Sequence, residues 1–196
     1  MLRLKGDNKK LIILLHEIYG INDHIRQYAE KFFHAGYDIL CPDFIHKEKA
    51  FSYADEQVAY THFTEQIGFD RASKKVASLI QQESACYGEI HVIGFSIGAT
   101  VAWLCSGMEE ITTVSGYYGS RIRDALDVEP VCPVLLIYGQ EEKSFDVKQL
   151  AASLTAKNII VHITEGCHGF ADPYAAAFHE KSAKAALSLI QAFIQR

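Results

Sequence analysis

The feature of this sequence that most restricts the fold is a series of short apolar runs separated by segments of helical periodicity. The first run, Leu11–Leu15, is continuously apolar, which is typical of a strand covered on both faces. Strands that alternate with helices predict stacked βαβ units and a mostly parallel sheet. We expect strands at residues 11–15, 37–40, 89–93, 111–115, 133–138 and 159–164.

Helical segments occupy the intervals between these runs. Asn22 or Asp23 can cap a helix that Gly36 ends, and apolar residues recur on one stripe of a second helix at 70–84. Further helices are expected at 97–106, from 146 or 147 to about 156, and at 182–195. The chain, residues 1–196, is therefore predicted to form a single α/β domain with a sheet of about six or seven strands.

The stretch from Phe44 to Phe69 differs from the rest because its aromatic residues follow no single period. We interpret it either as a helix-containing excursion or as a flap over a site. Its aromatic side chains either pack in the core or line a pocket for an acyl or aryl group.

The composition excludes several classes of partner. A net charge of −5 gives no basic surface for nucleic acid or for an anionic membrane, and the run Leu11–Leu15 is far too short to span a bilayer. The N-terminal residues do not resemble a secretion signal. Five cysteines at irregular spacings, without a CxxC motif, fit a reducing compartment, so we expect a cytoplasmic protein. A homodimer is compatible with the sequence.

The pentapeptide Gly94-Phe95-Ser96-Ile97-Gly98 stands between a predicted strand and a helix rich in Ala, Val and Leu. In a nucleophile elbow, a serine occupies a sharp strand-to-helix turn that exposes its Oγ. Glycines flank the serine because the strand and the helix approach too closely for side chains. The helix N-terminus also supplies N–H groups near a developing oxyanion. A glycine-rich turn with a serine N-cap is the alternative, but the strand-to-helix context favours the elbow.

A carboxylate and a histidine follow this serine, in the order that such elbows require. The predicted strand 133–138 leads into a loop with Glu142, and the predicted strand 159–164 leads into a loop with His168. Because the carboxyl ends of parallel strands meet at one edge of the sheet, these side chains and Ser96 are expected to lie together. His168 would accept the serine proton, while the carboxylate would hold the tautomer of the imidazole.

The identity of the acid is open among three residues. The position of Glu142 in the loop favours it, but Glu141 is adjacent and Asp146 follows four residues later. No HExxH motif or Cys/His cluster predicts a metal site, and we expect no cofactor.

Several motifs taken together resemble the dienelactone hydrolase family. His16–Asn22 resembles the glutamate-bearing signature of the family, and the elbow follows it in the order of the family. Gly116–Gly119, the turn 139–142 and Gly166–Phe170 also recur in that order. The resemblance covers about residues 11 to 170.

This resemblance implies a three-layer αβα sandwich without a separate cap domain, and hydrolysis of an ester or lactone without a cofactor. By position, Ser96 replaces the usual cysteine nucleophile, His168 is the base, and Glu142 stands where an aspartate is usual. The N–H groups of Ile18 and Ile97 would form the oxyanion hole.

Some residues keep two interpretations. Glu17 matches a glutamate that contacts the resting nucleophile in the family, but a loop carboxylate that anchors backbone amides is an equal alternative. Tyr118 follows a predicted strand end and is a candidate substrate contact. Arg121 and Arg123 are better interpreted as solvated surface residues than as part of the site, and Cys167 as structural.

The sequence thus predicts a serine esterase or lactonase that acts on a small-molecule substrate through an acyl-enzyme. Two alternatives stay open. The same triad can serve a thioesterase or a small amidase or peptidase. A hydrolase fold can also carry a catalytically silent ligand-binding protein.

Overall fold

The computed structural model describes residues 1–46, 49–154 and 158–195. Seven strands form one sheet in the order β1-β3-β2-β4-β5-β6-β7. All neighbouring strands are parallel except β1, which pairs antiparallel with β3. The strands are β1 (Leu2–Leu4), β2 (Lys10–Leu15), β3 (Asp38–Cys41), β4 (Glu89–Phe95), β5 (Thr113–Tyr117), β6 (Val134–Gly139) and β7 (Ile159–Thr164).

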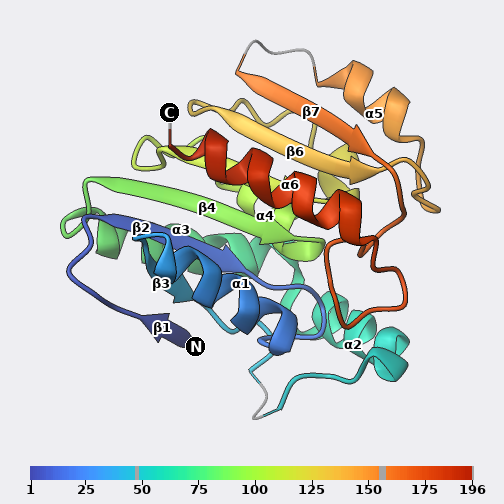
Figure 1. Ribbon diagram of the computed structural model, residues 1–196, viewed down its shortest axis with the longest axis horizontal. Helices are drawn as coiled ribbons and strands as arrows, with labels where there is room; N and C mark the ends of the chain where they lie inside the picture. Colours follow the sequence, from blue (N-terminus) through green and yellow to red (C-terminus); the bar gives the residue numbers. More distant parts are fainter. Residues whose placement is uncertain (47–48, 155–157, 196) are drawn as a thin grey trace.

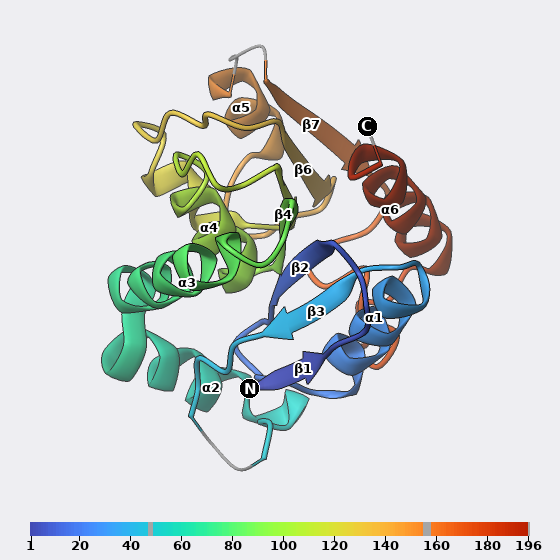
Figure 2. The ribbon, with the colours of Figure 1, turned by 90° about the vertical axis from the view of Figure 1, so that its left-hand side faces the viewer.

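Helices cover both faces of this sheet and make three layers. Figure 2 shows α1 and α6 on one face, and α3 and α4 on the other. The helices are α1 (Asp23–His34), α2 (Glu56–His62), α3 (Gly68–Ser84), α4 (Ile97–Leu104), α5 (Val147–Ser153) and α6 (Glu180–Phe193). The predicted αβα sandwich without a cap domain is confirmed. None of the helices in the described ranges is both long and apolar enough to cross a membrane.

The strands at the centre of the sheet carry the core. In β2 every residue from Leu11 to Leu15 is buried, as expected for a parallel strand that helices cover on both sides. Helix α4 is almost entirely buried, from Ile97 to Trp103, because it packs against the middle of the sheet. A helix that is apolar on all sides fits only such a position.

The strand expected at 111–115 is wrong by two residues, since β5 runs from Thr113 to Tyr117 and pairs with β4 up to Phe95. Because Gly116 has no apolar side chain, the apolar run in the sequence ends before the strand itself ends at Tyr117. A Cβ at Gly116 would lie 3.0 Å from Leu136 Cδ2 and 3.2 Å from Ala99 Cβ, which explains why glycine occupies the middle of this strand.

The stretch from Phe44 to Phe69 is an excursion that contains helices, as one of the two interpretations states. It includes the 3₁₀ turn η1 (Tyr53–Asp55), α2 and the π-helical turn η2 (Phe63–Ile67). In Figure 1, α2 lies near the carboxyl ends of the strands. Residues 47 and 48 lie outside the described part of the chain, as does 156, the expected end of α5.

The connection from β4 to α4 brings backbone segments into close contact. A Cβ at Gly94 would lie 2.2 Å from the Gly98 carbonyl oxygen, and a Cβ at Gly98 would lie 2.4 Å from the Leu15 carbonyl oxygen. Only glycine therefore allows α4 to approach β4 and the end of β2. Since the chain order reverses between β2 and β4, this contact lies at the switch point where sites form in parallel sheets.

The substitution Gly98→Ala tests this packing. Its Cβ meets backbone atoms that cannot move without displacing β2, so we expect a loss of unfolding free energy of about 3 kcal/mol, the upper end of the typical cost of overpacking. The matched variant is Gly88→Ala, whose Cβ would lie 3.9 Å from its nearest neighbour. Denaturant unfolding that gives both variants the stability of the parent would contradict the close approach.

Candidate active site

Ser96 occupies the turn between β4 and α4 in a strained conformation. Its φ of 51° and ψ of −112° are rare for a residue with a side chain. The turn is held because the Ser96 N–H donates to the Tyr117 carbonyl oxygen at 2.9 Å. Ser96 is half-buried, and it lines a cleft at the carboxyl edge of the sheet.

Two hydrogen bonds connect Ser96 to His168 and then to Glu142. Ser96 Oγ lies 2.9 Å from His168 Nε2, and His168 Nδ1 lies 3.0 Å from Glu142 Oε2. A carboxylate only accepts, so Nδ1 carries the proton and Nε2 is free to accept from the serine hydroxyl. The structure thus brings together the three predicted side chains from three separate loops.

The other two acid candidates occupy different positions. Asp146 caps α5, where its Oδ1 accepts from the N–H groups of Lys148 and Gln149. Glu141 is exposed and lines the cleft. The side chain of Glu142 is 1% exposed, which protects its bond to His168 from competing water.

The surroundings of His168 determine its proton affinity. Desolvation lowers the pKa of the imidazole, but the hydrogen bond and charge of Glu142 outweigh it, with smaller contributions from the charges of Glu17 and Glu56. The net result is a pKa above the ordinary value of histidine. A base of this kind is neutral, and can accept a proton, only when the pH exceeds its raised pKa.

Tyr118 lies against His168. Its ring centroid is 4.8 Å from the imidazole, and its side chain is fully buried. The residue has a positive φ of 42°, and its N–H donates to the Ile137 carbonyl oxygen at 2.7 Å. Tyr118 therefore packs against the imidazole of His168 and does not line the open cleft.

The loop after β2 supplies Glu17 and the N–H of Ile18 to the same edge. The Glu17 carbonyl oxygen accepts from the Gly20 N–H at 3.1 Å, which closes a turn. In the described part of the chain, no protein acceptor is found for the N–H of Ile18 or of Ile97. Backbone N–H groups that lack a partner at a turn or at a helix start can donate to another acceptor.

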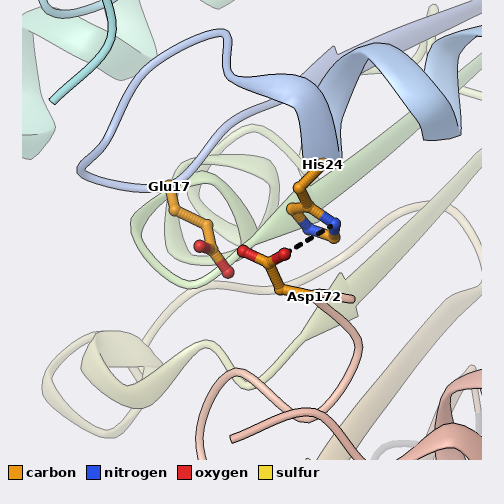
Figure 3. A group of neighbouring side chains, drawn as sticks. All are labelled: Glu17, His24 and Asp172. Atoms are coloured by element: carbon orange, nitrogen blue, oxygen red, sulfur yellow. Dashed lines mark ion pairs between the residues drawn. The ribbon is translucent and has the colours of Figure 1, made fainter. Parts of the chain in front are cut away.

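The carboxyl group of Glu17 faces a buried cluster and not the backbone amides of its own loop. Figure 3 shows it pointing toward Asp172, with His24 on the opposite side of that carboxylate. His24 Nδ1 lies 3.8 Å from Asp172 Oδ1, and the hydroxyl of Tyr53 donates to Asp172 Oδ2 at 2.6 Å. Within the described residues, Glu17 Oε1 has no hydrogen-bond partner.

Burial and charge shift two groups of this cluster in opposite directions. Desolvation, with the nearby charge of Asp172, raises the pKa of Glu17 to about 7. Desolvation also lowers the pKa of His24 to about 4, so its imidazole is neutral. Glu17 is accordingly a carboxyl group that holds its proton in weakly acidic solution.

Glu17, His24 and Asp172 are also the group of side chains that could coordinate a metal ion, since their ligand atoms lie within 4.8 Å of one another. The Asp172 oxygens, however, already accept from Tyr53 and from the Tyr174 N–H. A proton on Glu17 neutralises the second carboxyl group. Within the described residues, Glu17 Oε1 and both ring nitrogens of His24 have no hydrogen-bond partner.

A cleft of about 470 Å³ opens over Ser96 and His168. Its walls come from the β2 loop, the excursion and the loops after β6 and β7. The lining residues are Glu17, Ile18, Tyr19, Tyr53, Glu56, Ser96, Glu141, Lys143, Cys167, His168, Gly169 and Ala175–Ala177. Arg121 and Arg123 instead form ion pairs with Asp124, which agrees with their interpretation as surface residues.

The model of the dienelactone hydrolase family matches residues 2–196. The chain belongs to this family. It is 38% identical to "Uncharacterized protein YczH" of Bacillus subtilis (strain 168) over 186 residues, 93% of this chain and 91% of that protein.

Solved structures of this family and of esterases share the fold. A crystal structure of a protein from Klebsiella pneumoniae, provisionally named a dienelactone hydrolase, superposes with a TM-score of 0.78 at 20% identity over 98% of this chain and 89% of its own. A cold-adapted esterase from an Arctic intertidal metagenomic library superposes with a TM-score of 0.68 at 17% identity over 95% and 84%. These structures support the architecture of this family member.

Several residues at the candidate site of this dienelactone hydrolase family member could not be identified from the sequence. Tyr53 was only one of many aromatic residues in the excursion, and Asp172 had no signal beyond its place after His168. His24 follows the helix cap Asn22, so its position near the carboxyl edge was the one clue. Glu56 could not be placed because the excursion had no clear period.

The variant Glu17→Gln tests the ionisation of Glu17. Because the folded-state pKa of Glu17, about 7, lies above the ordinary value of 4.5 for glutamate, the folded protein binds the proton more tightly than the unfolded chain. As Glu17 loses its proton, the unfolding free energy of the parent should therefore fall by about 3 kcal/mol between pH 4.5 and pH 8. The Glu17→Gln variant should not show this fall. Denaturant unfolding across this range measures it.

The exposed residue Glu110 provides the control for this measurement. Glu110→Gln should follow the pH profile of the parent. A profile of Glu17→Gln that is also parallel to the parent would show that Glu17 has an ordinary ionisation.

Proposed function

We propose that this protein is a serine hydrolase that cleaves small, neutral carboxylic esters or lactones through an acyl-enzyme. The observation that carries the proposal is the continuous hydrogen-bonded series from Ser96 Oγ through His168 to Glu142. Its geometry has two relationships that nucleophilic acyl transfer requires: a nucleophile lies beside a base, and a buried carboxylate orients that base.

In the first half of the reaction, Ser96 Oγ attacks the carbonyl carbon of the ester and its proton passes to His168 Nε2. The negative charge that develops on the carbonyl oxygen is stabilised by the N–H groups of Ile18 and Ile97. Glu142 stabilises the imidazolium. The intermediate then expels the alcohol, which takes the proton from His168, and an acyl group stays on Ser96.

In the second half, water enters the cleft and loses a proton to His168 Nε2 as its oxygen attacks the acyl carbon. The same two N–H groups hold the second oxyanion. The bond to Ser96 Oγ breaks, the serine regains its proton from His168, and the carboxylic acid leaves. For a lactone, the alcohol and the acid are parts of one molecule.

A serine at this position, in place of the usual cysteine of the family, fits the surroundings. The bond from Ser96 Oγ to His168 gives a weakly acidic hydroxyl the base that it needs. Cys167 is adjacent in sequence to the base and lines the cleft, so it is the competing nucleophile that an experiment must exclude.

The shape and charge of the cleft support a small, uncharged substrate. The volume of about 470 Å³ suits a small molecule. Among the described residues, the carboxyl groups of Glu17, Glu56 and Glu141 line the cleft beside the ammonium group of Lys143. The charge of Glu56 also raises the pKa of both Tyr19 and His168, which indicates that its field extends to the reacting atoms.

Ser96→Ala tests the nucleophile. With p-nitrophenyl acetate as substrate, we expect kcat/KM to fall by at least about a thousandfold, because removal of one member disables the whole unit. Stopped-flow absorbance should also show that the pre-steady-state burst of p-nitrophenol is lost.

Two variants complete this experiment. Ser153→Ala makes the same chemical change on the exposed side of α5 and should behave like the parent. Cys167→Ala should keep the burst. If Cys167→Ala loses the burst while Ser96→Ala keeps it, the proposed nucleophile is wrong.

Substrate charge gives a second prediction. Among acetate esters of matched size, the neutral one should have a kcat/KM about fivefold or more above that of one with a carboxylate in the alcohol part, because the acidic lining repels an anion. The ratio should shrink at high salt and in Glu56→Gln. Glu65→Gln, an exposed change in the same excursion, should leave the ratio unchanged. An anionic ester that is cleaved as fast as the neutral one would contradict the prediction.

A further inference from the structure

His16 is a fully buried histidine at the end of β2, beside the cleft but outside the hydrogen-bonded series of Ser96. Its two ring nitrogens have separate partners. Nε2 accepts from the Phe44 N–H at 2.9 Å, and Nδ1 lies 2.6 Å from the Glu17 carbonyl oxygen. Both hydrogen-bond partners are backbone groups, one from the start of the excursion and one from the loop after β2, and Nε2 also lies 3.9 Å from Asp43 Oδ1.

These contacts fix the tautomer of the ring. A backbone N–H can only donate, so Nε2 must be the unprotonated nitrogen that accepts from Phe44. The proton of the neutral ring is then on Nδ1, from which it donates to the Glu17 carbonyl oxygen. Burial lowers the pKa of His16 to about 4, so the ring is neutral at the pH where an ester hydrolase with His168 as base would work.

The Glu17 carbonyl oxygen belongs to the same peptide group as the Ile18 N–H. In a trans peptide, the oxygen and the hydrogen point in opposite directions. The carbonyl oxygen is held by two donors, His16 Nδ1 and the Gly20 N–H at 3.1 Å. Those donors therefore also determine the direction of the Ile18 N–H, which has no acceptor in the described part of the chain.

We propose that His16 is a positioning residue for catalysis: its Nδ1–H donates to the Glu17 carbonyl oxygen and thereby points the Ile18 N–H at the substrate oxyanion. This inference rests on the proposed function. The Phe44 N–H contributes by selecting the tautomer, so the start of the excursion is connected to the oxyanion hole. Among the described residues, loss of the His16 donor leaves the Gly20 N–H as the one donor to the Glu17 carbonyl oxygen, and Gly20 is a turn glycine with a φ of 92°.

Two amide variants separate this role from simple packing. In His16→Asn, the amide nitrogen can take the place of Nδ1 and keep the donor to Glu17. In His16→Gln, the longer side chain reaches the place of Nε2 and keeps the acceptor for Phe44, but it loses the donor to Glu17. Both variants remove the imidazole ring that packs against Phe44 at 4.8 Å, so both should lose similar unfolding free energy.

The expected result is a difference in kcat. His16→Gln should lower kcat for p-nitrophenyl acetate by about 10- to 100-fold with KM within about twofold, because an oxyanion donor acts mainly in the transition state. His16→Asn should keep kcat within about threefold of the parent. Equal kcat values for the two variants would overturn the proposal, while hydrolysis by the parent that depends on Ser96 would leave the proposed function intact.

A measurement on the unmodified protein does not depend on how the variants fold. The ¹⁵N chemical shifts of the His16 ring report which nitrogen carries the proton. We expect a neutral ring protonated on Nδ1 from pH 5 to pH 8. A ring protonated on Nε2, or a charged ring in this range, would overturn the proposal.

Discussion

The contact on which this structure most depends is the close approach of helix α4 to strands β4 and β2. It requires glycine at 94 and 98, because a Cβ at either position would lie within 2.4 Å of a backbone atom. The approach bends the chain so sharply that Ser96 has a positive φ. The packing of the sheet centre thus holds a strained serine at the carboxyl edge, and the stability of a buried helix offsets the strain.

The other components reach this serine because they follow neighbouring strands. Glu17 and Ile18 come after β2, Tyr118 after β5, Glu142 after β6 and His168 after β7. Burial then sets the protonation of each group. It keeps His16 neutral and raises the pKa of Glu17, while Glu142 keeps the pKa of His168 above its ordinary value. The excursion closes one side of the cleft, and Tyr53 attaches it to Asp172.

Much of this arrangement could be predicted from the sequence. The continuous apolar runs predicted the parallel sheet, and the glycines on both sides of Ser96 predicted its place in the turn. Both features depend on local constraints. The edge strand β1 was not expected because three residues carry no periodic signal. The cluster of Glu17, His24 and Asp172 could not be found because Asp172 lies far along the chain from the other two residues and no motif connects them. Glu142 could not be separated from Glu141 because loop conformation decides which carboxyl group turns inward. The catalytic roles of these residues stay predictions.

The proposed mechanism has two parts: Ser96 is the nucleophile, and the N–H groups of Ile18 and Ile97 bind the oxyanion. A crystal structure of the protein after reaction with a small fluorophosphonate tests both parts at once. We expect a covalent bond between phosphorus and Ser96 Oγ, with one phosphonyl oxygen about 2.7–3.1 Å from both backbone nitrogens. Phosphorus on another residue, or a phosphonyl oxygen that contacts neither nitrogen, would contradict it.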